Sequence, residues 1–271
     1  MRISVIQMSV TSEPAENLIH AGQLVRQAKQ AGADMVILPE MFVCTYENAS
    51  FLAHAEPVQG RIWQTLSRLA AENEIYLVGG SFPELEGERL YNTCFVFGPD
   101  GAQIARHRKA HLFDISVEGG QCFRESDTFS PGNDITLFPT KFGLMGLCIC
   151  FDFRFPELSR LMALEGAKVL LVPAAFNMTT GPLHWELLFR SRAVDNQVFT
   201  VGCAPARDEN GSYVSYGNSI IADPWGKVLS RAEGEETILT ADLDLEEIDR
   251  VRQQLPLMSA RRTDLYRLQR R

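Results

Sequence analysis

The feature that most constrains this chain is a continuous apolar run, residues 144–155, that ends in a thiol, an acid and a base. The run contains Gly146 and is followed directly by Pro156 and Glu157. A short apolar run with this ending is typical of a buried strand that turns into a helix opening with proline. We therefore predict an α/β fold with Cys150 at the carboxyl end of that strand, where open α/β sheets handle their ligands.

Cys150 is the candidate nucleophile, because an adjoining helix N-terminus lowers the pKa of a thiol. The alternative is that Cys150 is one more buried cysteine, since free cysteine is among the most buried residue types. Cys148 lies two residues earlier, and a Cys-x-Cys pair could suggest a metal. A zinc site needs three or four converging ligands, and the chain has no second cysteine pair at ligand spacing. We interpret Cys148 as strand packing.

Composition places limits on the partners of the chain. The 271 residues fit one large α/β domain, and an apolar content of 45% is ample for a core. The net charge of −8 and the pI near 5.2 argue against a nucleic-acid surface. The basic residues at the C-terminus, 267–271, are expected to form a solvated tail.

Cysteine usage and the N-terminus give the expected compartment. The six cysteines are scattered without framework spacing through a chain too long to need disulfides. The N-terminus enters a strand pattern at once, with neither a signal sequence nor an apolar span of about 20 residues. We expect a reduced, soluble, cytoplasmic protein with no membrane partner.

Hydrophobic periodicity predicts a single domain of alternating strands and helices. No repeat, low-complexity segment or Pro/Ser-rich linker interrupts the chain, so we expect one domain over residues 1–271 with a mixed sheet, or two sheets packed face to face. The predicted strands are 2–7, 34–40, 75–78, 90–97, 102–107, 169–172, 198–203, 237–242 and one on each side of the turn at 223–226. The predicted helices are 16–31, 62–72, 157–165, 183–196 and 245–254.

Two further residues could assist a thiol nucleophile. Glu40 ends the apolar run 36–39, a costly place for an acid unless it has a partner or a task; the alternative is a strand end that faces solvent. Lys109 lies in the segment 106–111, which is mostly basic or imidazole. Taken alone, that segment could equally be a solvated strand or a patch that binds phosphate.

His107 and His111, four residues apart, could ligate zinc on a helix. No glutamate lies between them as in a metalloprotease motif, and no third ligand is evident, so we predict no metal.

Three segments, taken in order, resemble the signature segments of the nitrilase superfamily of carbon-nitrogen hydrolases. They are Leu-Pro-Glu-Met-Phe around Glu40, Arg-Lys-Ala-His-Leu-Phe around Lys109, and Cys-Ile-Cys-Phe-Asp-Phe-Arg-Phe-Pro-Glu around Cys150. Cys148 stands where a small residue is usual, and Phe151 where tyrosine is common. Further matching stretches lie at 91–93, 218–226, 252–256 and 261–266.

Within that superfamily the chain is most similar to the ω-amidases, which act on 2-oxoglutaramate and 2-oxosuccinamate. The similarity is carried by residues 113–115, 175–182, 184–188 and 190–197. The deaminated glutathione amidases share the pattern Thr-Gly-Pro-x-His-Trp-Glu but differ in the residues before it.

The resemblance implies a four-layer αββα sandwich and a homodimer, with the C-terminal tail, about residues 252–271, at the dimer interface. It implies Cys150 as nucleophile, Glu40 as general base and Lys109 as oxyanion donor, the last assisted by the backbone N–H of Phe151. Glu125 matches the additional acid that positions the substrate and the lysine. No metal or organic cofactor has a role in this chemistry.

The implied reaction is hydrolysis of the terminal amide of a small 2-oxo dicarboxylate monoamide to the dicarboxylate and ammonia through a Cys150 thioester. The substrate carboxylate calls for a cation or hydrogen-bond donors, and Arg154 is a candidate by position. The alternative is a salt bridge from Arg154 to Asp152 or to another nearby acid. The other candidates for the pocket wall, each of which could instead be plain packing, are Tyr46, Phe151, Phe176, Asn177 and Thr179.

Two other functions stay open from the sequence. The same machinery could act on deaminated glutathione, a carbamoyl compound or a nitrile. A protein of another class, a dimeric interaction protein without catalysis, could keep the scaffold alone, but the presence of all three chemical groups counts against it.

Overall fold

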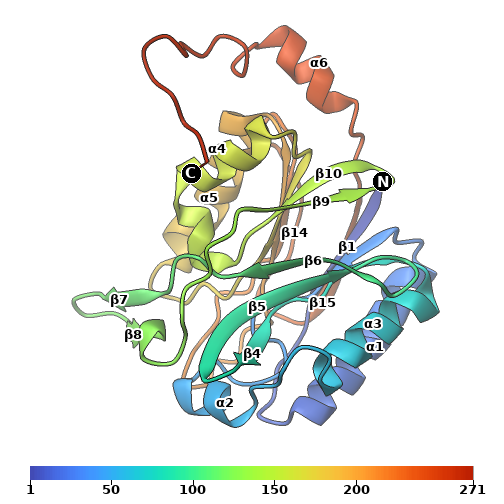
Figure 1. Cartoon of the computed structure of the whole chain (residues 1–271), viewed down its shortest axis with the longest axis vertical. Coiled ribbons are helices and arrows are strands. Elements are labelled where there is room, and N and C mark those ends of the chain that lie inside the picture. The colour runs from blue at the N-terminus through green and yellow to red at the C-terminus, as the bar shows by residue number, and fades with distance from the viewer. Residues whose placement is uncertain (271) are drawn as a thin grey trace.

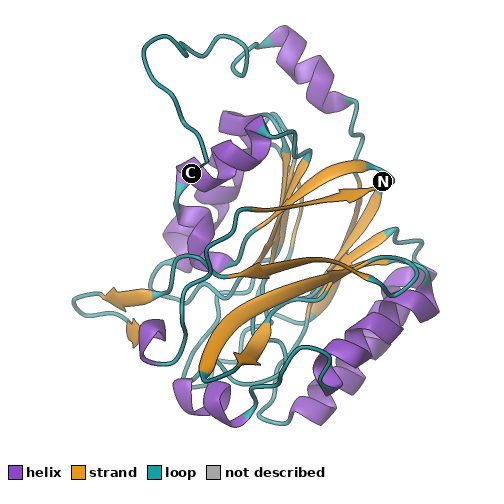
Figure 2. Ribbon diagram, in the orientation of Figure 1, coloured by secondary structure: helices purple, strands orange, loops and turns teal. Residues whose placement is uncertain are grey.

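Two β-sheets pack face to face in the computed structural model, which describes residues 1–270 (Figure 1). Within these residues, a seven-stranded sheet has the order β15-β1-β2-β3-β5-β4 with β6 paired to β5, and a six-stranded sheet has the order β14-β13-β12-β11-β10-β9. Helices cover the outer faces of both sheets, as Figure 2 shows. The predicted four-layer αββα sandwich is confirmed.

The first sheet combines parallel and antiparallel pairing. Helices α1 (Pro14–Gln30) and α3 (Arg61–Asn73) follow β1 and β2 in the chain, so β1, β2 and β3 run parallel. The remaining strands pair antiparallel. The strands are β1 (Arg2–Gln7), β2 (Met35–Ile37), β3 (Tyr76–Val78), β4 (Phe82–Glu86), β5 (Arg89–Phe97), β6 (Gln103–Arg108) and β15 (Thr237–Asp242).

The second sheet also combines parallel and antiparallel pairing. Helices α4 (Pro156–Leu164) and α5 (Gly181–Asn196) connect three parallel strands, β10, β11 and β12, and antiparallel strands flank them. The strands are β9 (Thr136–Thr140), β10 (Gly143–Leu147), β11 (Val169–Pro173), β12 (Phe199–Cys203), β13 (Ile220–Ala222) and β14 (Val228–Arg231).

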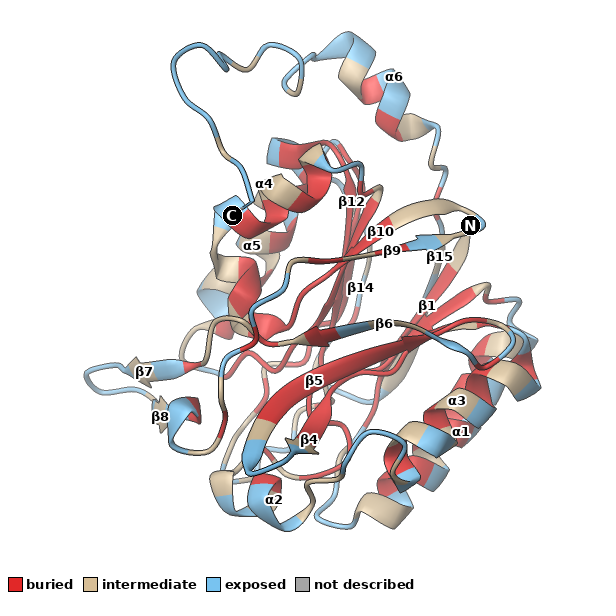
Figure 3. Ribbon diagram, viewed as in Figure 1, coloured by how far each residue is buried: buried red, intermediate tan, exposed pale blue. Residues whose placement is uncertain are grey.

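The alternation of side chains along the strands builds two cores. Buried residues run along the central strands of both sheets (Figure 3). In β2, Met35 and Ile37 belong to the cluster shared with the second sheet, whereas Val36 between them packs with the residues of α1 and α3. Successive strand residues point to opposite faces, so one short apolar strand serves both layers. This explains why β2 is buried throughout.

Several short elements were not predicted. They are α2 (Asn48–Ala53), β4, β9 and the small ribbon of β7 (Asp114–Ser116) and β8 (Cys122–Arg124), which forms a separate two-stranded sheet. The β7-β8 ribbon projects from the body near the edge of the sandwich (Figure 1). Elements of three to six residues show too little periodicity to distinguish a strand or a helix from a loop.

The C-terminal tail leaves the body of the protein. After α6 (Glu247–Gln254) it forms an open loop and returns so that Arg270 donates a hydrogen bond to the carbonyl oxygen of Ile135 at 3.0 Å (Figure 1). Leu265 and Tyr266 on this loop are exposed by 69% and 56%. The expected dimer contact of the tail stays a prediction, and Arg271 lies outside the described residues. No described helix has the length and apolar character needed to cross a membrane.

Candidate active site

Cys150 lies at the sharp turn between strand β10 of the second sheet and helix α4. Strand β10 ends at Leu147, three residues earlier than predicted, and the short helix η2 (Cys150–Arg154) leads into α4. The backbone of Cys150 has a φ of 46°, in the left-handed region that non-glycine residues rarely adopt. Such strain persists only where the surroundings hold it, and it is frequent at functional sites.

Glu40, Lys109 and Glu125 come from three separate segments and meet in the interior. The Lys109 Nζ atom lies 2.9 Å from Glu40 Oε1 and 2.8 Å from Glu125 Oε2, and all three side chains are fully buried. The alternatives of a solvent-facing Glu40 and a solvated Lys109 are therefore wrong. A buried lysine between two carboxylates is costly unless it has a task.

Asn92 on β5 completes this cluster. Its Nδ2 atom donates to Glu40 Oε1 at 2.8 Å and to Glu125 Oε1 at 2.9 Å. Sequence reasoning placed Asn92 in a matching stretch but gave it no role. The available signal was an amide within a strand that is otherwise mostly apolar, because a buried amide needs partners.

The charges within the cluster perturb one another. Burial alone would lower the pKa of Lys109, but the carboxylates of Glu125 and Glu40 outweigh it and raise that pKa above its ordinary value. Burial raises the pKa of Glu125 despite its contact with Lys109. Glu40 Oε2 is buried and has no hydrogen-bond partner among the described residues.

The Cys150 thiol does not have the lowered pKa that the neighbouring helix suggested. Burial, and next the Glu40 carboxylate, raise its pKa well above the ordinary value, whereas Lys109 and the backbone N–H of Ala175 oppose this rise. The thiol is 4% exposed. The sulfur therefore keeps its proton at rest, and Glu40 is the adjacent carboxylate that can remove it.

The comparisons with known proteins agree with this geometry. Residues 2–253 match the carbon-nitrogen hydrolase family. The chain belongs to the carbon-nitrogen hydrolases. It is 50% identical to mouse Omega-amidase NIT2 over 98% of this chain and 96% of that protein, and 48% identical to the human Omega-amidase NIT2 over the same shares.

Solved structures give the same assignment. Saccharomyces cerevisiae Nit3, a member of branch 10 of the nitrilase superfamily, matches this carbon-nitrogen hydrolase with a TM-score of 0.90 and 42% identity over 97% of this chain and 96% of that chain. An amidase mutant from Nesterenkonia sp. AN1, with the acetamide moiety of fluoroacetamide added covalently to its active-site cysteine, matches with a TM-score of 0.82 and 25% identity over 98% of this chain and 95% of that chain. This carbon-nitrogen hydrolase is a member of the nitrilase superfamily.

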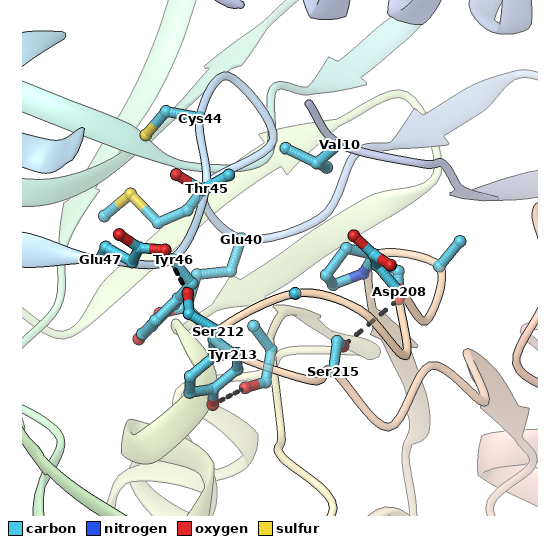
Figure 4. Close-up of a pocket in the computed structure, with 15 residues that line it drawn as sticks. Val10, Glu40, Cys44, Thr45, Tyr46, Glu47, Asp208, Ser212, Tyr213 and Ser215 are labelled. Carbon is cyan, nitrogen blue, oxygen red and sulfur yellow. Dashed lines mark hydrogen bonds between the residues drawn. The ribbon is translucent and has the colours of Figure 1, made fainter. Parts of the chain in front are cut away.

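A cavity of about 190 Å³ opens beside Glu40 in this carbon-nitrogen hydrolase (Figure 4). Tyr46 lines this cavity, and its hydroxyl donates a hydrogen bond to Glu40 Oε1 at 3.3 Å. Tyr213, from the loop between β12 and β13, stacks on Tyr46 with ring centroids 4.4 Å apart and donates a hydrogen bond to the Ala175 carbonyl. Sequence reasoning selected Tyr46 but missed Tyr213, because nothing local links a loop tyrosine to a distant site.

Arg154 does not pair with Asp152, so that alternative is wrong. Its guanidinium contacts His184 Nδ1 at 3.0 Å, donates to Thr180 Oγ1 at 3.0 Å and lies 4.3 Å from the ring centroid of Phe176. No carboxylate of residues 1–270 lies within salt-bridge distance of Arg154. Burial lowers its pKa, while the nearby Cys150 raises it. Arg154 is therefore a cation near the thiol without an anionic partner in the described chain.

Among the described residues, the wall of this cavity does not include the candidates Phe151, Asn177 and Thr179. Phe151 lies in η2, with its ring 5.4 Å from that of Phe113. Asn177 is buried and organises its own loop, because its Oδ1 accepts from the backbone N–H groups of Thr179 and Thr180 at 3.1 Å each. Thr179 accepts a hydrogen bond from the backbone of Gln121 in the β7-β8 ribbon. The Asn177 loop thus joins that ribbon to the site region.

The imidazoles of His107 and His111 both contact Asp152, at 2.9 and 2.8 Å. No cluster of three metal-ligating side chains occurs in residues 1–270. These histidines thus have a hydrogen-bonding partner that the sequence did not reveal.

Proposed function

We propose that this amidase hydrolyses the terminal amide of a small 2-oxo dicarboxylate monoamide, such as 2-oxoglutaramate or 2-oxosuccinamate. The observation that carries the proposal is Lys109, buried between Glu40 and Glu125 beside the Cys150 thiol. This is the set that a thiol acyl transfer needs: nucleophile, base and oxyanion donor. Identity of 50% to mouse Omega-amidase NIT2 supports the substrate class.

In the first half of the reaction Glu40 takes the proton of the Cys150 thiol, and the sulfur attacks the amide carbon. The Lys109 ammonium and the backbone N–H of Phe151 stabilise the oxyanion. Phe151 is the second residue of η2, where backbone N–H groups lack an intrahelical acceptor. One such donor is worth about 2.7–4 kcal/mol in other enzymes. Glu40 returns the proton to the leaving nitrogen, ammonia departs, and a thioester remains.

In the second half a water molecule attacks the thioester. Glu40 takes one proton from the water, the new oxyanion again forms opposite Lys109, and the carbon–sulfur bond breaks. The proton returns to the sulfur, so the dicarboxylate is released and the thiol is restored. Glu125 and Asn92 hold Lys109 and Glu40 in place throughout, through the contacts that they make in the resting structure.

We place the substrate carboxylate against Arg154. A guanidinium binds a carboxylate through paired N–H donors, and Arg154 has no anionic partner among residues 1–270. The contacts with His184 and Thr180 fix its orientation, and Phe176 supports its face. The rings of Tyr46 and Phe151 form apolar walls in this arrangement.

The direct experiment measures ammonia release from 2-oxoglutaramate by the wild type, Cys150→Ala and Cys148→Ala. Cys148 is the matched control, since it is a fully buried thiol two residues away. We expect turnover that vanishes in Cys150→Ala and persists in Cys148→Ala. Activity that survives the loss of the Cys150 thiol would remove it as the nucleophile. If the enzyme prefers deaminated glutathione when both amides are offered in competition, the proposed mechanism stands and the substrate assignment is wrong.

Arg154→Gln tests the carboxylate contact. We expect KM for 2-oxoglutaramate to rise by about 10- to 100-fold, because a hydrogen bond to a charged group contributes about 1.5–3 kcal/mol. The matched measurement uses a neutral amide of the same length, whose KM should change little. An equal rise for both amides would show that Arg154 acts on the shape of the pocket and not on the carboxylate.

We further propose that the protein is a cytoplasmic homodimer. The six cysteines are free thiols, which fits a reducing compartment. Leu183 and Leu187 on α5 are exposed by 75% and 61%, and Trp225 by 47%. Exposed apolar side chains together with the open C-terminal tail fit burial against a second copy. Light scattering should give a dimer for the wild type and a monomer for Leu187→Asp; a wild-type monomer would refute this proposal.

A further inference from the structure

Asp152 receives an unusual number of hydrogen bonds for a side chain outside the Glu40–Lys109–Glu125 cluster. Its Oδ1 accepts from the backbone N–H groups of Ala110 at 3.1 Å and His111 at 2.8 Å, and from His111 Nδ1 at 2.8 Å. Its Oδ2 contacts His107 Nε2 at 2.9 Å and the backbone N–H of Ile149 at 3.1 Å. The carboxylate is completely buried, and both of its oxygens are satisfied.

These contacts belong to two segments that are distant in the sequence. His107, Ala110 and His111 surround Lys109 at the end of β6. Ile149 directly precedes Cys150, and Asp152 itself follows Cys150 by two residues, with its own N–H bonded to the Ile149 carbonyl at 3.0 Å. One carboxylate therefore ties the segment that carries the lysine to the turn that carries the thiol.

The strained backbone at Cys150 needs such an anchor. A φ of 46° at a non-glycine residue is unfavourable and relaxes unless neighbouring contacts prevent it. The hydrogen bonds of Asp152 to Ile149 close the turn on its amino side. Those to Ala110 and His111 fix the same turn against the lysine segment.

We propose that Asp152 is a positioning residue that sets the place of Lys109 relative to Cys150 and thereby aligns the oxyanion donor with the nucleophile. The inference rests on the roles proposed above for these two residues. Asp152 touches neither of their side chains by hydrogen bond and acts through the backbone on each side of them. A displacement of about 1 Å in such a geometry can cost about 100-fold in rate.

Asp152→Asn is the main test. An asparagine has one acceptor oxygen and one NH₂ group, so in either orientation at least one of the present backbone N–H donors faces another donor. We expect kcat for 2-oxoglutaramate to fall about 100-fold while KM stays within about threefold, because alignment and not substrate affinity is lost. Iodoacetamide should alkylate Cys150 about tenfold more slowly at a fixed pH, since the thiolate loses the aligned ammonium.

Glu84→Gln is the matched control. Glu84 is also a fully buried carboxylate, and it accepts hydrogen bonds from Arg108, next to Lys109, and from Thr93. Among residues 1–270, its side-chain hydrogen bonds and ion pairs go to Thr93, Arg106 and Arg108 and not to the turn at Cys150. We expect a comparable loss of thermal stability in Glu84→Gln, with kcat within about twofold of the wild type.

His111→Phe serves if Asp152→Asn does not fold. Phenylalanine keeps the stacking on Phe155, at 3.8 Å between centroids, but removes one donor to Asp152. We expect kcat to fall by about three- to tenfold with KM unchanged. An unchanged kcat in this variant would overturn the proposal.

Three other results would also overturn it: kcat of folded Asp152→Asn within about twofold of the wild type, an equal fall of kcat in Glu84→Gln, or a rise of KM that accounts for the whole loss in kcat/KM. The alkylation rate separates this proposal from the proposed function. If the wild type releases no ammonia from 2-oxoglutaramate, the substrate assignment fails. Slower alkylation of Cys150 in Asp152→Asn still supports positioning, and an equal rate overturns it.

Discussion

Lys109→Met tests the buried cluster most severely. Methionine has nearly the length of lysine but no charge, so the variant leaves Glu40 and Glu125 buried without the ammonium that lies 2.9 and 2.8 Å from them. Breaking a buried ion pair by removing one partner costs about 3–5 kcal/mol. Asn92 still donates to both carboxylates, and the Phe113 N–H donates to Glu125 at 2.6 Å. We therefore expect a loss of about 3 kcal/mol in the free energy of unfolding near neutral pH.

The loss should depend on pH in a defined direction. Burial already raises the pKa of Glu125 in the wild type, and without Lys109 that pKa rises further. A folded-state pKa above the unfolded value means that the folded protein binds more protons, so stability falls as pH rises from the unfolded pKa, about 4.3, through the folded pKa. The deficit of Lys109→Met relative to the wild type should thus be smaller at about pH 5 than at about pH 7.5.

Urea unfolding followed by far-UV circular dichroism at these two pH values measures the effect. The double variant Lys109→Met/Glu125→Gln is the control, because it removes one of the two stranded carboxylates; it should recover about 1–2 kcal/mol at the higher pH. A deficit below about 1 kcal/mol, or one equal at both pH values, would refute the reasoning that the cluster is held by the buried charge of Lys109.

Three further variants test separate parts of the structure. Hydrogen bonds from His107 and His111 lower the pKa of Asp152 against the effect of burial. The stabilisation by its charge is therefore present above the unfolded pKa of about 3.9 and is lost as pH falls. In urea unfolding, the loss of stability caused by Asp152→Asn should become smaller as the pH is lowered. Gly202→Ala would place a Cβ 2.4 Å from the ring of Phe189, and thermal unfolding should show a loss of about 1–3 kcal/mol. Asn177→Ala should cost about 1 kcal/mol in urea unfolding, whereas Asn177→Asp keeps the acceptor and should cost less.

Periodicity alone anticipated much of the fold. The apolar patterns at residues 2–7 and 16–31 correspond to β1 and α1, and the turn at 223–226 separates β13 from β14. The patterns succeed because each of these elements buries one face or both against a neighbouring layer. The β7-β8 ribbon was not predicted because its three-residue strands are too short to show an alternating pattern and pair with each other outside the two large sheets.

The candidate site could be predicted only in part from the sequence. Signature segments brought Glu40, Lys109 and Cys150 into one hypothesis, and the structure places the first two in direct contact. Tyr213 was missed because it lies on the long loop between β12 and β13, and only the tertiary structure brings that loop to Tyr46. The alternative of a salt bridge between Arg154 and Asp152 failed, because sequence proximity says nothing about which way each side chain points from η2.

The most direct measurement is the location of the acyl group during turnover. The wild type would be quenched in acid while it hydrolyses 2-oxoglutaramate, digested with trypsin and analysed by mass spectrometry. Cleavage after Lys141 and Arg154 gives one peptide with both Cys148 and Cys150, so fragment ions must assign the modified sulfur. We predict an acyl group on Cys150 that is absent from Cys150→Ala. An acyl group on Cys148, or turnover without any acylated cysteine, would contradict the account.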